Sequence, residues 1–378
     1  MKPHIRYTVI ISLLLLCSCN QVQDNAKKNV ISVDIDKNDN ISIFDLFQKV
    51  EIVPLETNDL SFLRYISKVI YHNNLFYVFD FSEKKILAFD YDGRFKFKID
   101  NRGQGPEEYR AIADFDIDKE GGIISLLDPQ KMEFSDYSLE GHFLCKHKLP
   151  RLVNATYSSI KYINNNIVAL WSFDYSNRLK FYSKSDKKVF KECFPEEKAV
   201  FDQIYSEDFV YGNFLIRNFD NNVYEMLPEG DISVAYTWDF GELNYDHNKL
   251  DKPTKSNDDK FLLDFIDKIK SSQVVNYYFV KSGGNSDFIF TTVLRKDKRK
   301  NIWYNKSNNK TLVYENTMEG AHFKPFCWTD DFVLGYFYDS YDLNEVLPDA
   351  ILDEENIKKK NQINDDDNPV LIRYHFKK

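Results

Sequence analysis

A β-rich segment that recurs six times along the chain constrains its fold more than any other sequence feature. Each copy opens with an apolar strand, turns at polar residues and continues with a second strand. An Asp-Gly-like or Ser/Asn-Lys turn and a third strand close every copy except the shortened last one. The six copies begin at Asn73, Gly121, Asn165, Gly212, Ser286 and Asp330.

The spacing of the copies predicts a β-propeller. Successive copies are offset by 48, 44, 47, 74 and 44 residues, and four of these five intervals fit one propeller blade. One small antiparallel sheet cannot bury both of its apolar faces alone, whereas radial stacking of several sheets buries both. We therefore predict an all-β fold, a six-bladed β-propeller over residues 46–378. The offsets join equivalent apolar positions, which are Leu75, Ile123, Ile167, Phe214, Phe288 and Phe332.

The long interval between the fourth and fifth copies carries a helical pattern. Apolar residues recur there at i, i+1, i+4, i+5 and i+8, after a Ser/Asn/Asp-rich start that is typical of a helix N-terminus. We predict a short helical insertion between blades four and five. Covering an edge or rim of the propeller is its favoured role, and partner binding is the alternative. The apolar residues are Phe261, Leu262, Phe265, Ile266 and Ile269.

The two ends of the exported chain are predicted to close the ring. The sixth copy breaks off after Tyr338, and residues 339–368 are dominated by charge, so we expect a solvated loop there. Residues 368–376 then supply an outer strand whose apolar side chains alternate on one face. An early strand over residues 50–56 precedes blade one and can join the same sheet.

The first 19 residues have the layout of a lipoprotein signal. A basic start precedes an apolar run over residues 7–16 that is too short to span a bilayer permanently. The run ends in Leu16-Cys17-Ser18-Cys19, which resembles the bacterial lipobox. We predict a signal peptide over residues 1–18, lipid attachment at Cys19 and a polar tether over residues 19–45. The chain would be exported and anchored to the bacterial cell envelope, with the outer membrane favoured and the leaflet undecided.

Composition limits the partners and the redox chemistry. The formal net charge is −9 and no basic stripe interrupts the acidic body, so nucleic acid is excluded as an expected partner. The remaining cysteines, Cys145, Cys193 and Cys327, are odd in number and widely spaced. Three buried thiols are the favoured interpretation, and one disulfide between two of them stays open.

The most distinctive loop is RGQGPEEYR, over residues 102–110. One interpretation is structural, because Gly103 and Gly105 allow a tight backbone path between blades that Tyr109 anchors. The other is a polar ligand-contact cluster at the mouth of the central channel. The structural interpretation is favoured. The candidate contact residues are Arg102, Gln104, Glu107, Tyr109 and Arg110.

Asp114, Asp116 and Asp118 have the alternate spacing that can direct carboxylates at calcium. They do not form an EF-hand loop, because Lys119 holds the sixth position and Ser125 the twelfth. A strand with one polar face that runs into a glycine turn is the favoured interpretation. We therefore predict no cofactor, and these aspartates are weak calcium candidates.

Four blocks of the chain carry a family resemblance. They are VEIVPLETND at 50–59, KKILAFDYDGRF at 84–95, RGQGPEEYRAIADFDID at 102–118 and the terminal NPVLIRYHFKK. In this order they resemble the six-bladed β-propeller lipoproteins common in Bacteroidetes. The resemblance implies the architecture and the envelope location, and it carries over no catalytic residue.

Two functions remain open at this point. The favoured one is a lipid-anchored binding or scaffold module for a glycan, a peptide or an envelope protein, because the sequence has no HExxH, GxSxG, P-loop or CxxC motif. The alternative is a calcium-dependent hydrolase or lactonase-like enzyme with a site at the channel mouth. A convergent carboxylate cluster would favour the enzyme, and aromatic side chains exposed in the channel would favour binding.

Overall fold

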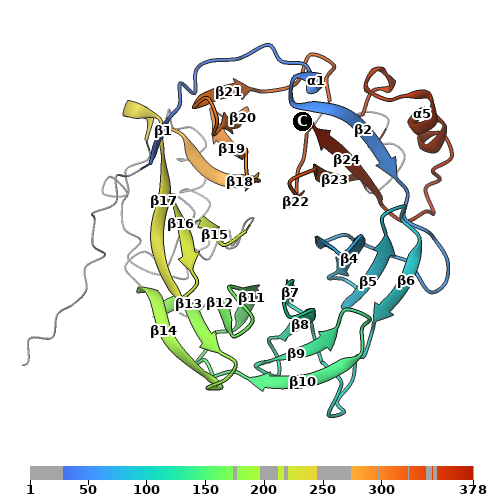
Figure 1. The fold of residues 1–378 in the computed structure, drawn as a ribbon, viewed down its shortest axis with the longest axis vertical. Coiled ribbons are helices and arrows are strands. Elements are labelled where there is room, and N and C mark those ends of the chain that lie inside the picture. Colours follow the sequence, from blue (N-terminus) through green and yellow to red (C-terminus); the bar gives the residue numbers. More distant parts are fainter. Residues whose placement is uncertain are drawn as a thin grey trace, which may run out of the picture.

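Six sheets stand around a central axis as the blades of a propeller (Figure 1). The structure is a computed structural model that describes residues 29–172, 177–195, 212–216, 220–244, 274–296, 298–321, 323–337, 343 and 347–377. Each sheet has four strands in this part of the chain. The prediction of an all-β, six-bladed propeller is therefore confirmed. The predicted helical insertion over residues 261–269 lies outside the described residues.

Blades one to three are each built from four consecutive antiparallel strands. Blade one contains β3 (Lys68–His72), β4 (Leu75–Asp80), β5 (Lys85–Asp90) and β6 (Phe95–Ile99). Blade two contains β7 (Asp114–Asp118), β8 (Ile123–Asp128), β9 (Glu133–Ser138) and β10 (Phe143–Lys148). Blade three contains β11 (Tyr157–Tyr162), β12 (Ile167–Ser172), β13 (Asn177–Ser183) and β14 (Lys188–Pro195).

Blades four and six each take in a strand from the N-terminal part of the chain. Blade four contains β15 (Phe214–Ile216), β16 (Asn222–Leu227), β17 (Asp231–Asp239) and β1 (Val30–Ser32). Blade five contains β18 (Asn276–Gly284), β19 (Phe288–Arg295), β20 (Lys298–Asn305) and β21 (Lys310–Tyr314). Blade six contains β22 (Cys327–Trp328), β23 (Phe332–Phe337), β24 (Val370–Phe376) and β2 (Phe47–Val53).

Both ends of the described chain close the ring, as the sequence predicts. In blade six, β24 lies between β23 and β2, and Tyr374 pairs with Val333 on one side and Val50 on the other. The propeller also begins earlier than the predicted residue 46. Strand β1 pairs in parallel with β17, and Ile31 and Val33 are buried at that blade. The predicted tether over residues 19–45 is therefore too long at its C-terminal end.

The solvated loop predicted over residues 339–368 is wrong for part of its length. Residues Glu354–Lys360 form helix α5, and a 3-10 turn, η3 (Asp349–Ile351), precedes it. Asp353 caps the helix through its side chain, acidic residues occupy the first turn, and three lysines occupy the last turn. This order of charges complements the helix dipole, so the charge run stabilises a helix instead of marking a loop.

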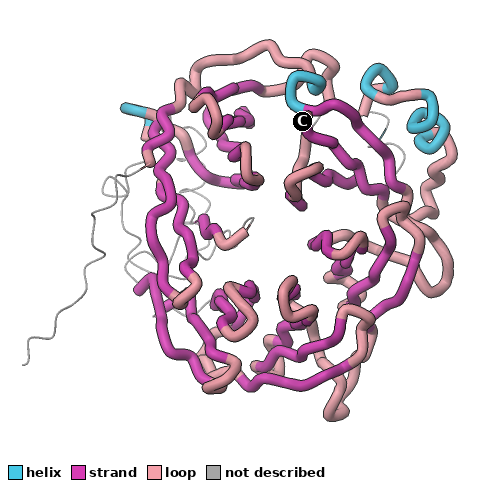
Figure 2. The backbone as a smooth tube through the Cα atoms, in the orientation of Figure 1, coloured by secondary structure: helices cyan, strands magenta, loops and turns pink. Residues whose placement is uncertain are grey.

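The hydrophobic core lies between neighbouring blades. At the contact of blades five and six, the ring of Phe47 packs edge-on against Trp303, with centroids 5.7 Å apart, and lies 5.3 Å from Tyr374. Between blades one and two, Tyr77 and Phe115 belong to one buried cluster. Helices α1 (Ile43–Leu46) and α5 lie on the outer rim (Figure 2). The interblade core therefore fixes the innermost strands around the axis.

Candidate functional site

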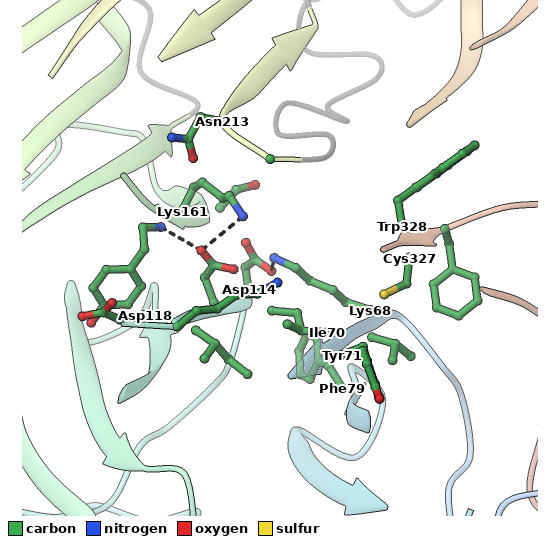
Figure 3. A pocket seen from close by; sticks show the side chains of 18 of the residues that line it. Lys68, Ile70, Tyr71, Phe79, Asp114, Asp118, Lys161, Asn213, Cys327 and Trp328 are labelled. Carbon is green, nitrogen blue, oxygen red and sulfur yellow. Dashed lines mark hydrogen bonds and ion pairs between the residues drawn. The ribbon is translucent and has the colours of Figure 1, made fainter. Parts of the chain in front are cut away.

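A cavity of about 690 Å³ lies at the centre of the ring, where the innermost strands face one another (Figure 3). Strands β3, β7, β11 and β22 supply most of its wall, and Asn213 and Ser282 add contacts from blades four and five. Residues from all six blades therefore reach one site. A ligand bound here would touch side chains that are far apart in the sequence.

One wall of the cavity is polar and is built on β7 of blade two. The ammonium of Lys68 donates a hydrogen bond to Asp114 Oδ1 at 2.8 Å and another to the carbonyl of Phe115 at 2.7 Å. The backbone N–H of Ile160 donates to Asp114 Oδ2 at 2.9 Å. Burial raises the pKa of Asp114, and the nearby Lys68 opposes that effect.

Asp116, two residues further along β7, has an equivalent role. The backbone N–H of Tyr162 donates to Asp116 Oδ2 at 2.7 Å, and Lys161 Nζ lies 3.5 Å from the same oxygen (Figure 3). Carboxylates of blade two thus accept hydrogen bonds from backbone amides of blade three. Asp116 joins blades two and three, Asp114 also reaches Lys68 of blade one, and each aspartate pairs with one lysine.

Asp118 is the third of the aspartates that were weak calcium candidates. Its Oδ1 accepts hydrogen bonds from the N–H groups of Glu120 and Gly121, at 3.2 and 3.0 Å, and so shapes the glycine turn after β7. Its Oδ2 is buried and has no hydrogen-bond partner in the described part of the chain. The triplet lies on one strand, as the sequence predicts. The three carboxylates have separate partners, however, and do not converge on one point.

The opposite wall of the cavity is aromatic. Tyr71 of β3, Phe326 and Trp328 of blade six line it and are only partly buried. The indole N–H of Trp328 has no partner among the described residues, and a Cβ added at Gly283 would lie 1.7 Å from that nitrogen. Gly283 therefore leaves the space that the indole occupies. Burial raises the pKa of the neighbouring Cys327 to about 11, so this thiol is not an activated nucleophile at neutral pH.

The loop over residues 102–110 does not reach this cavity. None of the predicted contact residues Arg102, Gln104, Glu107, Tyr109 and Arg110 is part of its wall. The loop instead has the structural role that the glycines indicated. Tyr109 is 1% exposed and donates to the carbonyl of Lys84 at 2.7 Å, and Glu108 accepts from the N–H of Gly105 at 2.7 Å. The loop runs from β6, the strand of blade one farthest from the axis, to β7 of blade two, and these five residues lie outside the wall of this cavity.

Sequence reasoning missed the lysines and aromatic residues that form the cavity walls. Five of the six innermost strands precede the apolar strands that open the predicted copies, as β3 precedes Leu75 at the start of β4 (Figure 1). Facing the channel, these strands mix charged, polar and apolar residues and lack a continuous apolar run. The channel wall could have been predicted from position alone. A short strand of mixed composition, a few residues before the apolar strand of a copy, lines the channel.

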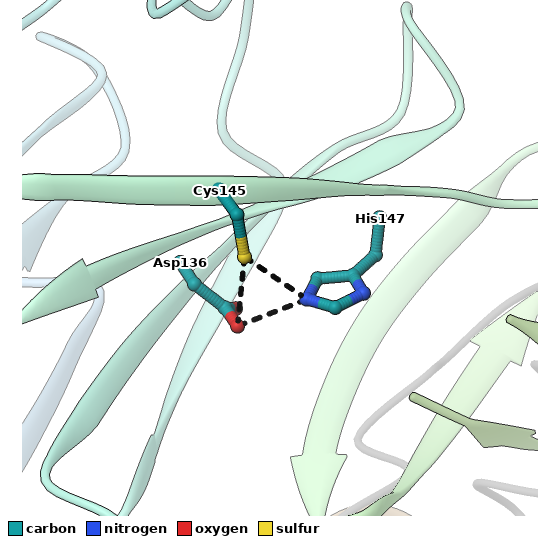
Figure 4. A group of neighbouring side chains, drawn as sticks. All are labelled: Asp136, Cys145 and His147. Carbon is teal, nitrogen blue, oxygen red and sulfur yellow. Dashed lines mark hydrogen bonds and ion pairs between the residues drawn. The ribbon is translucent and has the colours of Figure 1, made fainter. Parts of the chain in front are cut away.

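A second cluster, also missed, lies on the outer two strands of blade two. Asp136 of β9 is the cross-strand partner of Cys145 of β10, and His147 follows on the same face (Figure 4). His147 Nε2 lies 3.0 Å from Asp136 Oδ2 and 3.5 Å from Cys145 Sγ. Because both contacts use one ring nitrogen, the trio is not a nucleophile–base–carboxylate relay, which needs both nitrogens.

The cysteines differ from the sequence prediction in one respect. All three that the structure describes are free thiols, so none of them forms the disulfide that was left open. Cys193 is buried and Cys327 half-buried, but Cys145 is exposed, because it lies on the outermost strand of its blade. The prediction of three buried thiols is therefore wrong for Cys145.

Comparison with known proteins gives one family match. A family model described as "Domain of unknown function (DUF4934)" matches residues 28–375. No curated protein matches the chain.

One solved structure supports the fold. The crystal structure of a protein from Bacteroides fragilis NCTC 9343, named "Putative exported protein", aligns with a TM-score of 0.74 at 18% identity, over 93% of this chain and 100% of that one. A member of the DUF4221 family from Bacteroides vulgatus aligns with a TM-score of 0.49 at 11% identity, over 88% and 97%. Within the described residues of the present chain, every helix is too short or too polar to cross a bilayer.

Proposed function

Because this chain belongs to the DUF4934 family, whose description assigns no activity, we propose from its cavity that it is an envelope-anchored protein that binds a neutral oligosaccharide. One observation carries the proposal: two chemically different walls face each other across a cavity of about 690 Å³. Aromatic side chains line one wall, and hydrogen-bonding side chains line the other. Sugars present an apolar ring face and a hydroxyl edge, and these two walls complement both.

The charges in the cavity favour a ligand without net charge. Three basic and four acidic side chains line it, and two of the lysines are already paired with carboxylates of β7. An anionic ligand would meet excess carboxylate, and a cationic one would compete with Lys68 and Lys161. Asp118 Oδ2 and the Trp328 indole N–H have no hydrogen-bond partner among the described residues, but both atoms are buried, so a ligand hydroxyl would pair with them only after a local shift of these side chains.

The volume of the cavity, and the fact that several blades line it, suit a ligand of two or three sugar units better than the surface of a partner protein. Ligand pockets of small molecules fall in the range of about 300 to 1,000 Å³. A peptide could use the same walls, and it is the competing ligand that the experiment below must separate. The proposal selects the glycan from the three partner classes that the sequence left open.

The location in the cell envelope is part of the proposal. It is supported by the apolar leader over residues 7–16, by the lipobox-like end at Cys19 and by the name of the Bacteroides fragilis protein with the same fold. Lipid attachment at Cys19 would hold the propeller at a membrane surface, where envelope glycans are within reach. Cys19 lies outside the described residues.

The alternative of a calcium-dependent hydrolase has less support. Asp114 and Asp116 are bound to lysines and to β11 amides, and Asp118 shapes a turn. Calcium needs six to eight oxygen ligands around one point, and the described carboxylates do not surround such a point. An enzyme at this site would first have to break two interblade ion pairs.

Binding assays with matched variants test the proposal. Purified protein is titrated calorimetrically with neutral oligosaccharides, with acidic oligosaccharides and with short peptides. We expect saturable binding of a neutral oligosaccharide, weakened about tenfold or more by Tyr71→Ala, since one lost ring contact of about 1.4 kcal/mol is tenfold. Phe62→Ala is the control, because Phe62 is 49% exposed and lies outside the cavity wall.

Two results would contradict the proposal. One is tight binding of peptides with no response to any neutral oligosaccharide. The other is oligosaccharide binding that Tyr71→Ala and Phe62→Ala change equally, because the cavity would then not be the site.

A further inference from the structure

The trio Asp136, Cys145 and His147 lies at the seam between blades two and three. The ring of His147 stacks on Phe134 of its own blade, with centroids 4.5 Å apart, and meets Tyr182 of blade three edge-on at 6.3 Å. Asp136 is 2% exposed in its side chain and His147 10%, while Cys145 is open to solvent. None of the three lines the central cavity.

We propose that Asp136, Cys145 and His147 form a binding site for a divalent transition-metal ion, with Zn²⁺ as the best match. One carboxylate oxygen, one thiol sulfur and one imidazole nitrogen point toward a common centre (Figure 4). Among the residues that the structure describes, no other group of three His, Cys, Asp or Glu side chains brings its ligand atoms this close.

The distances between the ligand atoms match a tetrahedral ion. Bonds of about 2.3 Å to sulfur and about 2.0 Å to nitrogen and oxygen separate tetrahedral ligands by about 3.3 to 3.6 Å. In the structure, Sγ and Nε2 are 3.5 Å apart, Nε2 and Oδ2 are 3.0 Å apart, and Sγ and Oδ2 are 3.9 Å apart. Shifts of a few tenths of an ångström would complete the geometry.

The surroundings hold two of the three ligands in place. Ser125 Oγ donates to Asp136 Oδ1 at 2.5 Å, which leaves Oδ2 for the proposed ion. Stacking on Phe134 fixes the plane of the His147 ring, so that Nε2 keeps its direction. Such outer contacts are typical of metal sites, where they orient the ligands.

The chemistry of the donor set selects the ion. Calcium and magnesium prefer all-oxygen ligands, whereas a site with one thiolate and one imidazole favours zinc and its neighbours in the first transition row. Three protein ligands leave a fourth position, and the exposure of Cys145 gives the ion a path from solvent. Binding releases the thiol proton of Cys145, and the thiolate then bonds to the metal.

Lys184 of blade three is a built-in competitor for the ion. Its Nζ lies 2.8 Å from Asp136 Oδ2, the oxygen assigned to the metal, and 2.9 Å from the hydroxyl of Tyr162. Without metal, this ammonium balances the buried carboxylate. With metal, the ammonium must move away from Oδ2, so removal of its charge is expected to tighten metal binding.

Cobalt substitution tests the proposal directly. Co²⁺ occupies zinc sites and shows a thiolate-to-metal charge-transfer band when a cysteine is a ligand. We expect the purified protein to bind one equivalent of Co²⁺ with this band and to lose the band when Zn²⁺ is added. Cys145→Ser abolishes the band, and His147→Ala weakens binding at least tenfold. Lys184→Met strengthens it.

Two variants serve as matched controls. His142→Ala removes an exposed histidine of the same blade, and Cys327→Ser removes a thiol from a different blade, so both should bind Co²⁺ as the unmodified protein does. The proposal is overturned if the unmodified protein binds no Co²⁺, or if the charge-transfer band survives in Cys145→Ser. The readout is independent of oligosaccharide binding, so the two proposals can fail separately.

Discussion

At the residue scale, one glycine fixes the contact between blade one and the N-terminal strand of blade six. Gly93 has a φ of +86°, and an added Cβ would lie 2.1 Å from the carbonyl oxygen of Pro54. Gly320 also has a positive φ, +72°, but its Cβ would meet nothing within 4 Å. Both substitutions by alanine strain the backbone, and only the first one adds a clash.

We predict that Gly93→Ala lowers the free energy of unfolding by about 1 to 3 kcal/mol more than Gly320→Ala does. Urea unfolding of the two variants at one pH measures the difference. Equal losses would show that the approach to Pro54 contributes nothing.

Glu51 makes the stability of the fold depend on pH in the acidic range. Its carboxylate accepts hydrogen bonds from His375 at 3.1 Å and from Arg373 at 2.7 Å, and these contacts lower its pKa to about 2 from 4.5. A folded pKa below the unfolded one means that the contact stabilises the fold above about pH 4.5 and that this stability is lost as the pH falls toward about 2.

We therefore predict that Glu51→Gln destabilises the protein at pH 7, because it leaves the guanidinium of Arg373, which is 1% exposed, without its carboxylate. The gap in melting temperature between Glu51→Gln and the unmodified protein should shrink as the pH falls from 5 to about 2. Glu229→Gln, at an exposed turn of blade four, is the control. A gap that stays constant over this pH range would rule out the linkage.

At the element scale, helix α5 is tied to blade six by one side chain. Asn356 is fully buried, and its Oδ1 accepts a hydrogen bond at 2.8 Å from the N–H of Ile52 in β2. Its own N–H donates to the capping carboxylate of Asp353 at 2.9 Å. Asn356 therefore links the helix start to the strand that closes the ring.

We predict that Asn356→Ala costs more stability than Asp353→Ala. Loss of a helix cap costs about 1 kcal/mol, whereas Asn356→Ala also leaves the buried N–H of Ile52 unpaired, at about 1 to 3 kcal/mol more. Lys359→Ala, which removes an exposed pair with Glu355, should cost less than about 0.5 kcal/mol. Thermal unfolding of the three variants gives the order. An equal cost for Asn356→Ala and Asp353→Ala would contradict the role of Ile52.

The elements that sequence reasoning predicted are those whose pattern is local. Strand β24 was found because its apolar residues alternate, and the early strand predicted over residues 50–56 overlaps β2, which begins and ends three residues earlier. Helix α5 was missed because its buried face is made of Asn356 and Lys360, which are polar, and its exposed face is charged. A polar helix that is buried through hydrogen bonds has no hydrophobic period to detect.

At the scale of the whole molecule, the proposed anchor makes a prediction about location. Cys19→Ala should move the protein from the membrane fraction to the soluble fraction of its native host and abolish labelling by a fatty-acid probe. Cys17→Ala is the matched control, since Cys17 would be removed with the signal peptide. A Cys19→Ala protein that stays in membranes and carries the label would refute the assignment.

The ring could be predicted from the sequence, but the site could not. Six recurring copies define the number of blades without any knowledge of contacts. The cavity, in contrast, joins Lys68, Asp114 and Trp328 from three blades, and no spacing in the chain relates them. The glycine loop over residues 102–110 was considered as a ligand site because its sequence is unusual. Its residues serve packing, and the ordinary residues of the inner strands form the cavity.

A crystal structure with the oligosaccharide that binds best tests the central claim most directly. The account predicts a sugar ring against Tyr71 and Trp328, with hydroxyls directed toward the β7 wall at Asp118. An ordered oligosaccharide on the outer surface, with the central cavity holding only water, would contradict it.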